Sequence, residues 1–218
     1  IMVGGVMRCL GSAQRLRTKY GKGYQIEFGM EIPSVDEVSE YANQLVQQGC
    51  IPADTDARAE TREDQDSVPY SNIVLNMESV KECFTTYGKP EWCQRLTPEL
   101  SGSDLVTAFE SQGGANFRHV CSWMILESRY GDITTFLEQT FESFVLHERQ
   151  PSKIRIEVPS ELKDGKGVLK LGAMFKAVEE KKAALHIESY SMAQTSLEQI
   201  FNFFAQQQEE ETGATGAF

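Results

Sequence analysis

Four segments in which hydrophobic and polar residues alternate set the strongest limit on the fold. They cover residues 24–30, 144–149, 153–158 and a run that begins at Leu185, and such alternation is typical of half-buried β-strands. Only Pro151-Ser152 separates the second segment from the third, which predicts a hairpin. Helical patterns fall before the second segment and after the third. The resulting order βαββαβ is that of a ferredoxin-like sandwich, so we predict an α+β fold with one antiparallel sheet.

The two helices of this pattern are predicted from apolar residues at helical spacing. Asp132 is expected to cap the first helix. A loop through Gly167 leads to the second. The residues expected to face the core are Ile133, Phe136, Leu137 and Phe141 in the first helix and Leu169, Met174, Phe175 and Val178 in the second.

The segment 185–205 predicts a strand followed by a sharply capped helix. The strand breaks at Gln194-Thr195, and Thr195 and Glu198 have the spacing of a capping box. The helix then presents one apolar face, made of Leu197, Ile200, Phe201 and Phe204. This face either closes the sandwich or docks another part of a larger protein, and Phe203 lies off the face, where it could remain exposed to a partner.

The first residues of the chain predict a second small motif. Two short apolar runs flank Gly4-Gly5, which is typical of a β-hairpin, and Ser12 is expected to cap a basic helix over residues 13–20. A two-stranded hairpin is barely stable alone in water. We therefore expect its partner strands to lie upstream and the chain to be a fragment.

Both motifs resemble the C-terminal part of A-subfamily ABC transporters, which move lipids with ATP. In that family the second nucleotide-binding domain closes with a similar hairpin, and the regulatory domain ends with a similar strand and helix. The first match comprises Ile1-Met2-Val3, Gly5, Arg8-Cys9-Leu10-Gly11-Ser12, Gln14, Leu16, Gly21, Gly23 and Tyr24. The second comprises Leu185-His186-Ile187-Glu188, Tyr190-Ser191, Gln194-Thr195-Ser196-Leu197-Glu198-Gln199 and Ile200-Phe201.

The resemblance implies a domain organisation. Residues 1–20 would be the terminal hairpin and helix of a nucleotide-binding domain, and residues 21–30 with 131–208 a ferredoxin-like regulatory domain. Residues 31–130 match nothing in the family and are interpreted as an acidic linker plus a helical insertion. Residues 209–218 are expected to be a disordered tail.

The insertion is predicted to be mainly helical. Ser34 and Glu37 form a capping box for a helix that ends at Gly49. Residues 52–69 are rich in charge and poor in apolar side chains, so we expect a flexible linker. Short helices follow between 76 and 130, with a turn at Pro90, a cap at Ser103 and a stop at Gly113-Gly114.

Charge argues against some classes of partner. The net charge is −11 at pH 7, which disfavours nucleic acid because that ligand requires a basic face. Residues 31–130 hold 17 acidic against 7 basic residues. This acidity is interpreted as a solvated surface, with a docking surface for a basic partner as the alternative.

Catalytic motifs are absent from the sequence. The phosphate-binding pattern G-x-x-x-x-G-K-[ST] does not occur, and Gly165-Lys166-Gly167 lacks the hydroxyl residue that would contact Mg²⁺. We therefore expect no ATP hydrolysis and no cofactor in this chain. By resemblance, ATP and Mg²⁺ belong to the full-length parent.

The cysteines and histidines are the candidate metal ligands and catalytic residues of the sequence. Five cysteines without a C-x-x-C pair favour free thiols. Cys83, Cys93, Cys121 and His119 would form a metal site only if the insertion brought them together. His147 and His186 fall in predicted strands and are interpreted as packed or surface side chains.

Three functional hypotheses follow. The first is a non-catalytic regulatory domain on the cytoplasmic face of a membrane, where it contacts the upstream nucleotide-binding and transmembrane domains and the regulatory domain of the other half. Lipid would be the substrate of the parent, and Leu197, Phe201, Phe203 and Phe204 would dock within the transporter. The second is a free-standing ferredoxin-like module that binds a small ligand. The third is a thiol- or zinc-dependent enzyme.

Overall fold

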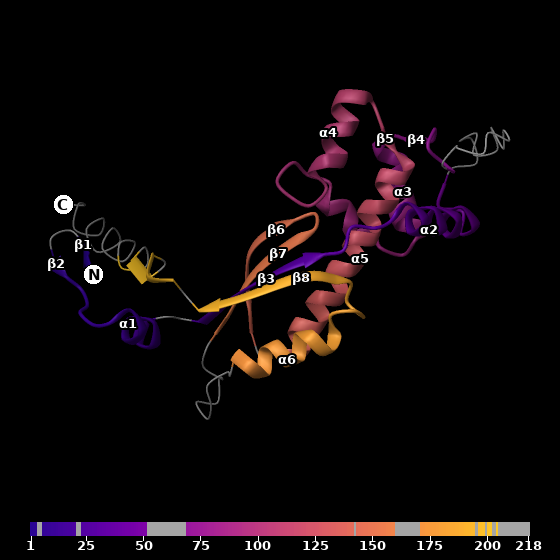
Figure 1. Ribbon diagram of the computed structural model, residues 1–218. Coiled ribbons are helices and arrows are strands. Elements are labelled where there is room, and N and C mark those ends of the chain that lie inside the picture. The colour runs from indigo at the N-terminus through magenta and orange to yellow at the C-terminus, as the bar shows by residue number, and fades with distance from the viewer. Residues whose placement is uncertain are drawn as a thin grey trace, which may run out of the picture. The chain divides into compact units, whose positions relative to one another are not determined.

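The computed structural model describes residues 1–3, 6–20, 23–51, 69–141, 143–159, 171–194, 196–198, 200, 201 and 204 (Figure 1). The chain divides into two compact units. The first comprises Ile1–Gly29, Phe136–Glu148 and Ile154–Phe218, and the second comprises Met30–Thr135 and Arg149–Lys153.

A four-stranded antiparallel sheet organises the first unit. Its strands are β3 (Gly23–Met30), β6 (Val145–Gln150), β7 (Lys153–Pro159) and β8 (Ile187–Gln194), in the spatial order β6-β7-β3-β8. The prediction of an α+β chain with one main antiparallel sheet is therefore confirmed.

One face of this sheet is buried. Alternate residues of the two central strands have almost no exposed surface, and they include Ile26, Phe28, Ile154, Ile156 and Val158. Helix α6 (Leu171–Lys181) runs beside the sheet, next to the C-terminal end of α5 (Phe117–Thr140) (Figure 1). Met174 and Val178 of α6 are buried as expected, whereas Phe175 is 38% exposed and does not face the core as predicted.

Glycine is required where β3 begins. A Cβ atom at Gly23 would lie 2.1 Å from the carbonyl oxygen of Val158 on β7. Real Cβ atoms do not approach backbone so closely, so only glycine lets the two strands pair at this point.

The predicted N-terminal hairpin is present. Strands β1 (Met2–Val3) and β2 (Val6–Met7) pair antiparallel, with Met2 opposite Met7. Helix α1 (Ala13–Tyr20) follows, and the Ser12 hydroxyl accepts a hydrogen bond from the Arg15 amide at 3.3 Å, as expected of an N-cap.

The second unit is mostly helical. It contains α2 (Val35–Gln47), α3 (Met77–Thr86), the 3₁₀ helix η1 (Pro90–Arg95), α4 (Ser103–Gln112) and most of α5. Two short strands that the sequence did not predict, β4 (Val74–Leu75) and β5 (Ala115–Asn116), pair antiparallel.

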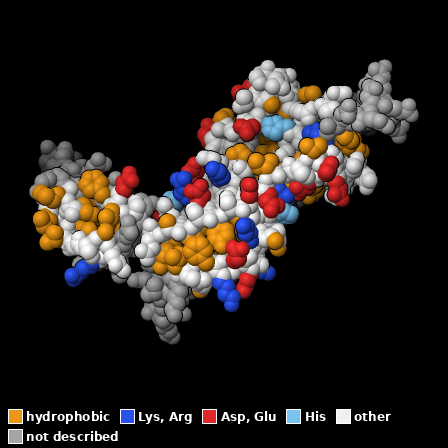
Figure 2. Space-filling model, viewed as in Figure 1, with side chains coloured by type: hydrophobic (Ala, Val, Ile, Leu, Met, Phe, Trp, Pro, Cys, Tyr) orange, Lys and Arg blue, Asp and Glu red, His pale blue; other side chains and the backbone are white. Residues whose placement is uncertain are grey.

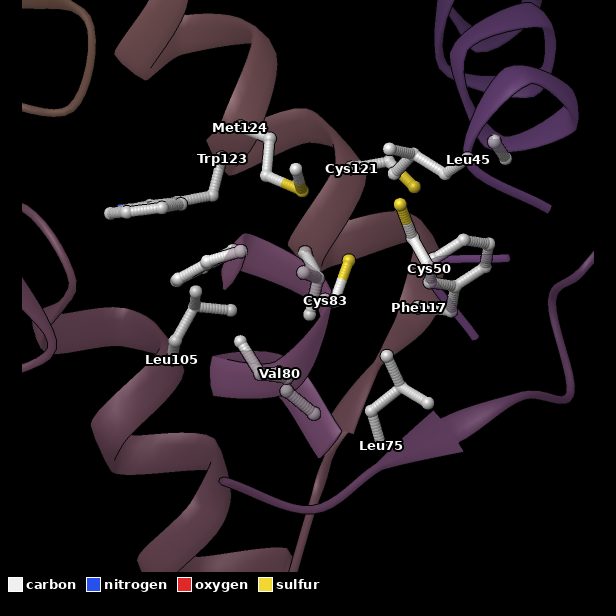
Figure 3. Packing of buried hydrophobic residues seen from close by; sticks show 14 of the residues in the cluster. Leu45, Cys50, Leu75, Val80, Cys83, Leu105, Phe117, Cys121, Trp123 and Met124 are labelled. Carbon is white, nitrogen blue, oxygen red and sulfur yellow. The ribbon is translucent and has the colours of Figure 1, made fainter. Parts of the chain in front are cut away.

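A hydrophobic core fills this unit (Figure 3). Phe84 of α3 stacks on Trp123 of α5, with ring centroids 5.1 Å apart, and meets the edge of Trp92 at 5.8 Å. All three rings are buried. Aromatic contacts therefore join α3, η1 and α5.

Two predicted caps differ from the structure. Ser34 accepts from the Glu37 amide at 3.1 Å, but the Glu37 carboxylate pairs with Arg129 instead of closing the capping box. Gly102, not Ser103, occupies the N-cap of α4. A Cβ at residue 102 would lie 2.5 Å from the Arg95 carbonyl oxygen, which explains why this residue is glycine.

The predicted helix start at Asp132 is wrong. Helix α5 continues without a break through Gly131 and Asp132. Buried Met124, Ile133 and Leu137 lie on both sides of the glycine, so packing maintains a helix that propensity alone would interrupt.

Gly131→Ala is expected to stabilise the protein by about 0.5–1 kcal/mol. Glycine is unfavourable in a helix interior, and a Cβ at this position would meet nothing within 4 Å apart from its chain neighbours and the backbone of its own helix. Urea denaturation measures the change. Unchanged or lower stability would contradict a continuous helix at this position.

The closing strand begins later than predicted. Leu185 and His186 lie in the turn before β8, and His186 has a φ angle of 51°, outside the strand region. Several expectations fall outside the described residues: most of the linker 52–69, the loop through Gly167 with Leu169, Thr195 of the capping box, Phe203 and the tail 209–218.

Within the part of the chain that the structure describes, no helix is long and apolar enough to cross a bilayer.

Candidate functional site

Three of the predicted docking residues, Leu197, Phe201 and Phe204, lie on the helical segment after β8, and Phe203 lies outside the described residues. Its first turn is marked by the Ile200 amide, which donates to the Ser196 carbonyl at 3.2 Å. Ile200 is buried, Leu197 and Phe204 are half-buried, and Phe201 is 43% exposed. The segment is therefore anchored through Ile200 and presents Phe201 to its surroundings.

A second candidate site is a buried carboxylate in the helical unit. The Glu127 side chain on α5 is 2% exposed. Its Oε2 accepts from Arg95 at the end of η1, and its Oε1 accepts from Arg149. A buried carboxylate between two guanidinium groups has both oxygens satisfied, as a buried charge requires.

Tyr130 completes this ion cluster, which we define as Arg95, Glu127, Tyr130 and Arg149. The guanidinium carbon of Arg149 lies 3.6 Å from the centre of the Tyr130 ring, and that of Arg95 lies 5.6 Å from it. Burial lowers the pKa of Arg149, while the charge of Glu127 acts in the opposite direction. The cation is thus stabilised by a carboxylate on one side and an aromatic face on the other.

The ion cluster has the properties of a structural element. Both carboxylate oxygens of Glu127 already accept charge-assisted hydrogen bonds from arginine side chains, and the Glu127 side chain is almost fully enclosed. The cluster joins η1, α5 and Arg149 within the second unit. Its effect is to fix these elements relative to one another.

Two further arginines of α5 tie the same unit together. Arg129 donates to Glu37 and to the Glu31 carbonyl. Arg118 donates to the Ser39 hydroxyl at 2.9 Å and to the Val35 and Pro69 carbonyl oxygens. These contacts hold the N-terminal part of α2 and the chain at Pro69 against α5.

Sequence reasoning missed the ion cluster. One signal was present: Val120, Met124 and Glu127 fall at i, i+4 and i+7, so the carboxylate lies on the buried stripe of the helix. A charge at such a position requires a partner. The identity of the partners depends on tertiary structure, because they come from distant parts of the chain.

The proposed ligand set Cys83, Cys93, Cys121 and His119 does not form a metal site. Among the described residues, no group of three or more Cys, His, Asp or Glu side chains could hold a metal ion. Cys83 and Cys121 are buried as free thiols, while His119 is exposed on α5. His147 Nε2 lies 2.8 Å from Glu157 Oε2, a partly exposed pair on β6 and β7.

The acidic side chains of the described residues can be followed on one face of the molecule. On the face shown in Figure 2, acidic side chains lie among uncharged, hydrophobic and basic ones and do not form one continuous patch. The interpretation of the acidic residues as a solvated surface stays a prediction.

Hydrophobic side chains gather on the visible face where α6 and β8 lie together (Figure 2). Between α6 and β8, the rings of Phe175 and Tyr190 pair with centroids 5.8 Å apart, and the Tyr190 hydroxyl donates to Glu179 at 2.6 Å. Phe175 therefore contacts a ring of β8 while it stays partly exposed.

No known family model matches this chain.

Proposed function

We propose that this chain is a non-catalytic regulatory segment of an A-subfamily ABC transporter, which helps couple ATP binding to lipid movement. The resemblance of the first residues and of the segment 185–201 to two motifs of that family, in the same order, carries the proposal. ATP and Mg²⁺ act in the parent protein, upstream of this chain, on the cytoplasmic face of a membrane.

The strand order supports a ferredoxin-like regulatory domain. Numbered along the chain, the four strands of the main sheet lie in the order 2-3-1-4. Two interlocked βαβ halves produce this order, with each helix crossing over one intervening strand. The helical unit inserted between β3 and β6 would then be an elaboration of that domain.

The segment after β8 is the proposed docking element. Ile200 holds it in place, and Phe201 presents an exposed aromatic ring together with half-buried Leu197 and Phe204. Its partners would be the neighbouring nucleotide-binding domain and the regulatory domain of the other half. Such an element can regulate only if its contacts differ between the open and closed states of the transporter.

The coding sequence upstream of Ile1 tests the family. We expect an apolar strand ending in Asp-Glu, followed by a histidine, within about thirty residues before the hairpin, and membrane-spanning helices farther upstream. An upstream sequence without these features would overturn the assignment.

Phe201→Ala in the full-length transporter tests the coupling role. Loss of the exposed ring is expected to lower lipid transport per ATP by about fivefold or more, the range of a typical coupling free energy. Transport into vesicles and phosphate release are measured on the same preparation. The folding of each variant is checked by its melting temperature, which an exposed residue should change little.

Phe175→Ala is the matched control, because Phe175 is a phenylalanine of similar exposure, 38% against 43%. It should leave the transport-to-ATP ratio unchanged. Equal ratios for wild type, Phe201→Ala and Phe175→Ala would contradict docking through Phe201, even if the upstream sequence confirms the family.

A further inference from the structure

Strand β8 forms an open edge of the main sheet. It pairs with β3 on one side, and within the described residues no other strand pairs with it. An edge strand presents a row of backbone N–H and C=O groups to which a further strand can bind. Beyond buried Ile187, residues 188–194 are exposed or half-buried, contain no proline and carry one charged side chain, that of Glu188. This edge therefore has few of the features that block strand addition.

The opposite edge, strand β6, is protected by charge. Its six residues include His147, Glu148 and Arg149 in succession. His147 Nε2 lies 2.8 Å from Glu157 Oε2, and Glu148 Oε2 lies 2.9 Å from Arg155 Nη1. Charged side chains on an edge strand disfavour the approach of another strand, because their water and their partners would have to be given up. Of the two edges, β8 is the one suited to pairing.

The side chains of β8 divide between two faces of the sheet. Tyr190 lies on the face covered by α6, where its ring pairs with that of Phe175, and hydrophobic side chains are visible over these two elements (Figure 2). Consecutive residues of a strand point to opposite faces. Met192 therefore shares the face of Tyr190, and Ser189 and Ser191 lie on the other. The open edge thus combines an apolar side with a side of small hydroxyl residues.

We propose that β8 pairs antiparallel with β8 of a second copy of this chain, so that the two sheets join across a twofold axis at Ser191. Main-chain hydrogen bonds along the joined strands supply the affinity. The pairing closes after two copies, because each copy has then used its open edge and retains only the protected edge at β6. The inference rests on the sheet and does not depend on the proposed transporter family.

Self-pairing suits the side chains of this edge. An axis at residue 191 overlaps the exposed part of both strands completely and places Tyr190 opposite Met192 of the second copy, a favourable contact between a ring and a sulfur atom. Glu188 falls opposite the uncharged Gln194 of the second copy, so no like charges face each other along the pair. A strongly charged strand from another protein would find only Glu188 to pair with. A neutral strand of the same pattern, which a second copy provides, fits better.

The mass of the purified full chain in solution tests the proposal. Light scattering is expected to give 24.5 kDa at low protein concentration and to rise toward twice that value as the concentration increases. Each copy has a net charge of −11, so added salt, which screens the repulsion, should strengthen the association. Amide hydrogen exchange of the wild-type chain should slow in residues 188–194 at high concentration and not at low concentration.

Charged variants at the axis identify the strand. Ser191→Lys and Ser191→Glu each place like charges opposite each other and are expected to weaken dimerisation by about tenfold or more. A mixture of the two variants should dimerise again, because opposite charges then meet at the axis. Ser111→Lys is the matched control: Ser111 is exposed on α4, and its substitution changes the net charge by the same amount as Ser191→Lys. Its dimerisation should remain close to that of the wild type.

A chain that keeps the monomer mass at every concentration would overturn the proposal. A dimer that persists unweakened in both Ser191 variants would overturn it as well, since association would then use another surface, such as the exposed ring of Phe201. If a Ser191 variant folds poorly, the exchange measurement on the wild-type chain decides. Equal exchange of residues 188–194 at low and high concentration would contradict pairing through β8.

Discussion

Glu127→Ala is expected to lower the free energy of unfolding by about 3–5 kcal/mol. The substitution leaves the guanidinium groups of Arg95 and Arg149 without their shared carboxylate, and the side chain of Arg149 is only 17% exposed. An uncompensated buried charge is far more costly than a lost surface ion pair. Urea denaturation followed by circular dichroism measures the change.

Three further variants separate charge from packing. Glu127→Gln keeps the side-chain volume. If it lowers the free energy of unfolding about as much as Glu127→Ala does, the loss is due to the missing charge. Replacing Arg95 and Arg149 with Met together with Glu127→Leu should restore part of the stability, because apolar residues of similar volume can replace a buried ion cluster. Glu91→Ala is the control: its pair with Lys89 is about half exposed, and the loss should stay below about 1 kcal/mol. Wild-type stability of Glu127→Gln would contradict a structural role for the cluster.

Phe84→Ala is expected to destabilise the helical unit by about 3–5 kcal/mol. The ring has no exposed surface and contacts the rings of Trp92 and Trp123. Its removal leaves a cavity between three elements. Denaturation followed by tryptophan fluorescence reports on the same contacts.

The control for this cavity is Phe84→Leu, which keeps most of the apolar volume and should lose clearly less stability than the alanine variant. A loss below about 1 kcal/mol for Phe84→Ala would mean that the core collapses around the missing ring. Such a result would contradict the tight aromatic packing described here.

Much of the sheet could be predicted because its signals are local. Alternation along β3 and β7 determines which residues are buried, and Pro151-Ser152 leaves room only for a tight turn between β6 and β7. Helix α1 was predicted with its bounds for the same reason, since Ser12 and the residues after it carry the information.

The errors arise where tertiary contacts override local preference. Asp132 has the chemistry of a cap, yet apolar residues on both sides of it continue the buried stripe of α5. Ser103 is also a good cap by type, but the Arg95 carbonyl excludes every residue except glycine at the position before it. In both cases, the atoms that determine where the helix begins belong to other turns of the helix or to other elements.

The candidate site was predictable only in part. The position of Phe201 on a capped helix after a strand follows from spacing, whereas its exposure depends on what Ile200 packs against. For the ion cluster, the sequence offered one weak signal, which is the position of Glu127 on the buried stripe of α5. Residues 95 and 149 could not be assigned to it, because no local pattern joins positions so far apart.

The close approach at Gly23 gives a way to recognise diverged relatives. A side chain at that position would collide with the main chain of Val158, so a homologue that keeps these two strands paired is expected to have glycine there even when little else is shared. This glycine and the hydrophobic residues at every second position after it form a short sequence pattern. We expect the pattern to be kept even when the rest of the sequence has diverged. Sequences with this glycine directly before a strand of alternating hydrophobic and polar residues are therefore the best candidates for distant homologues.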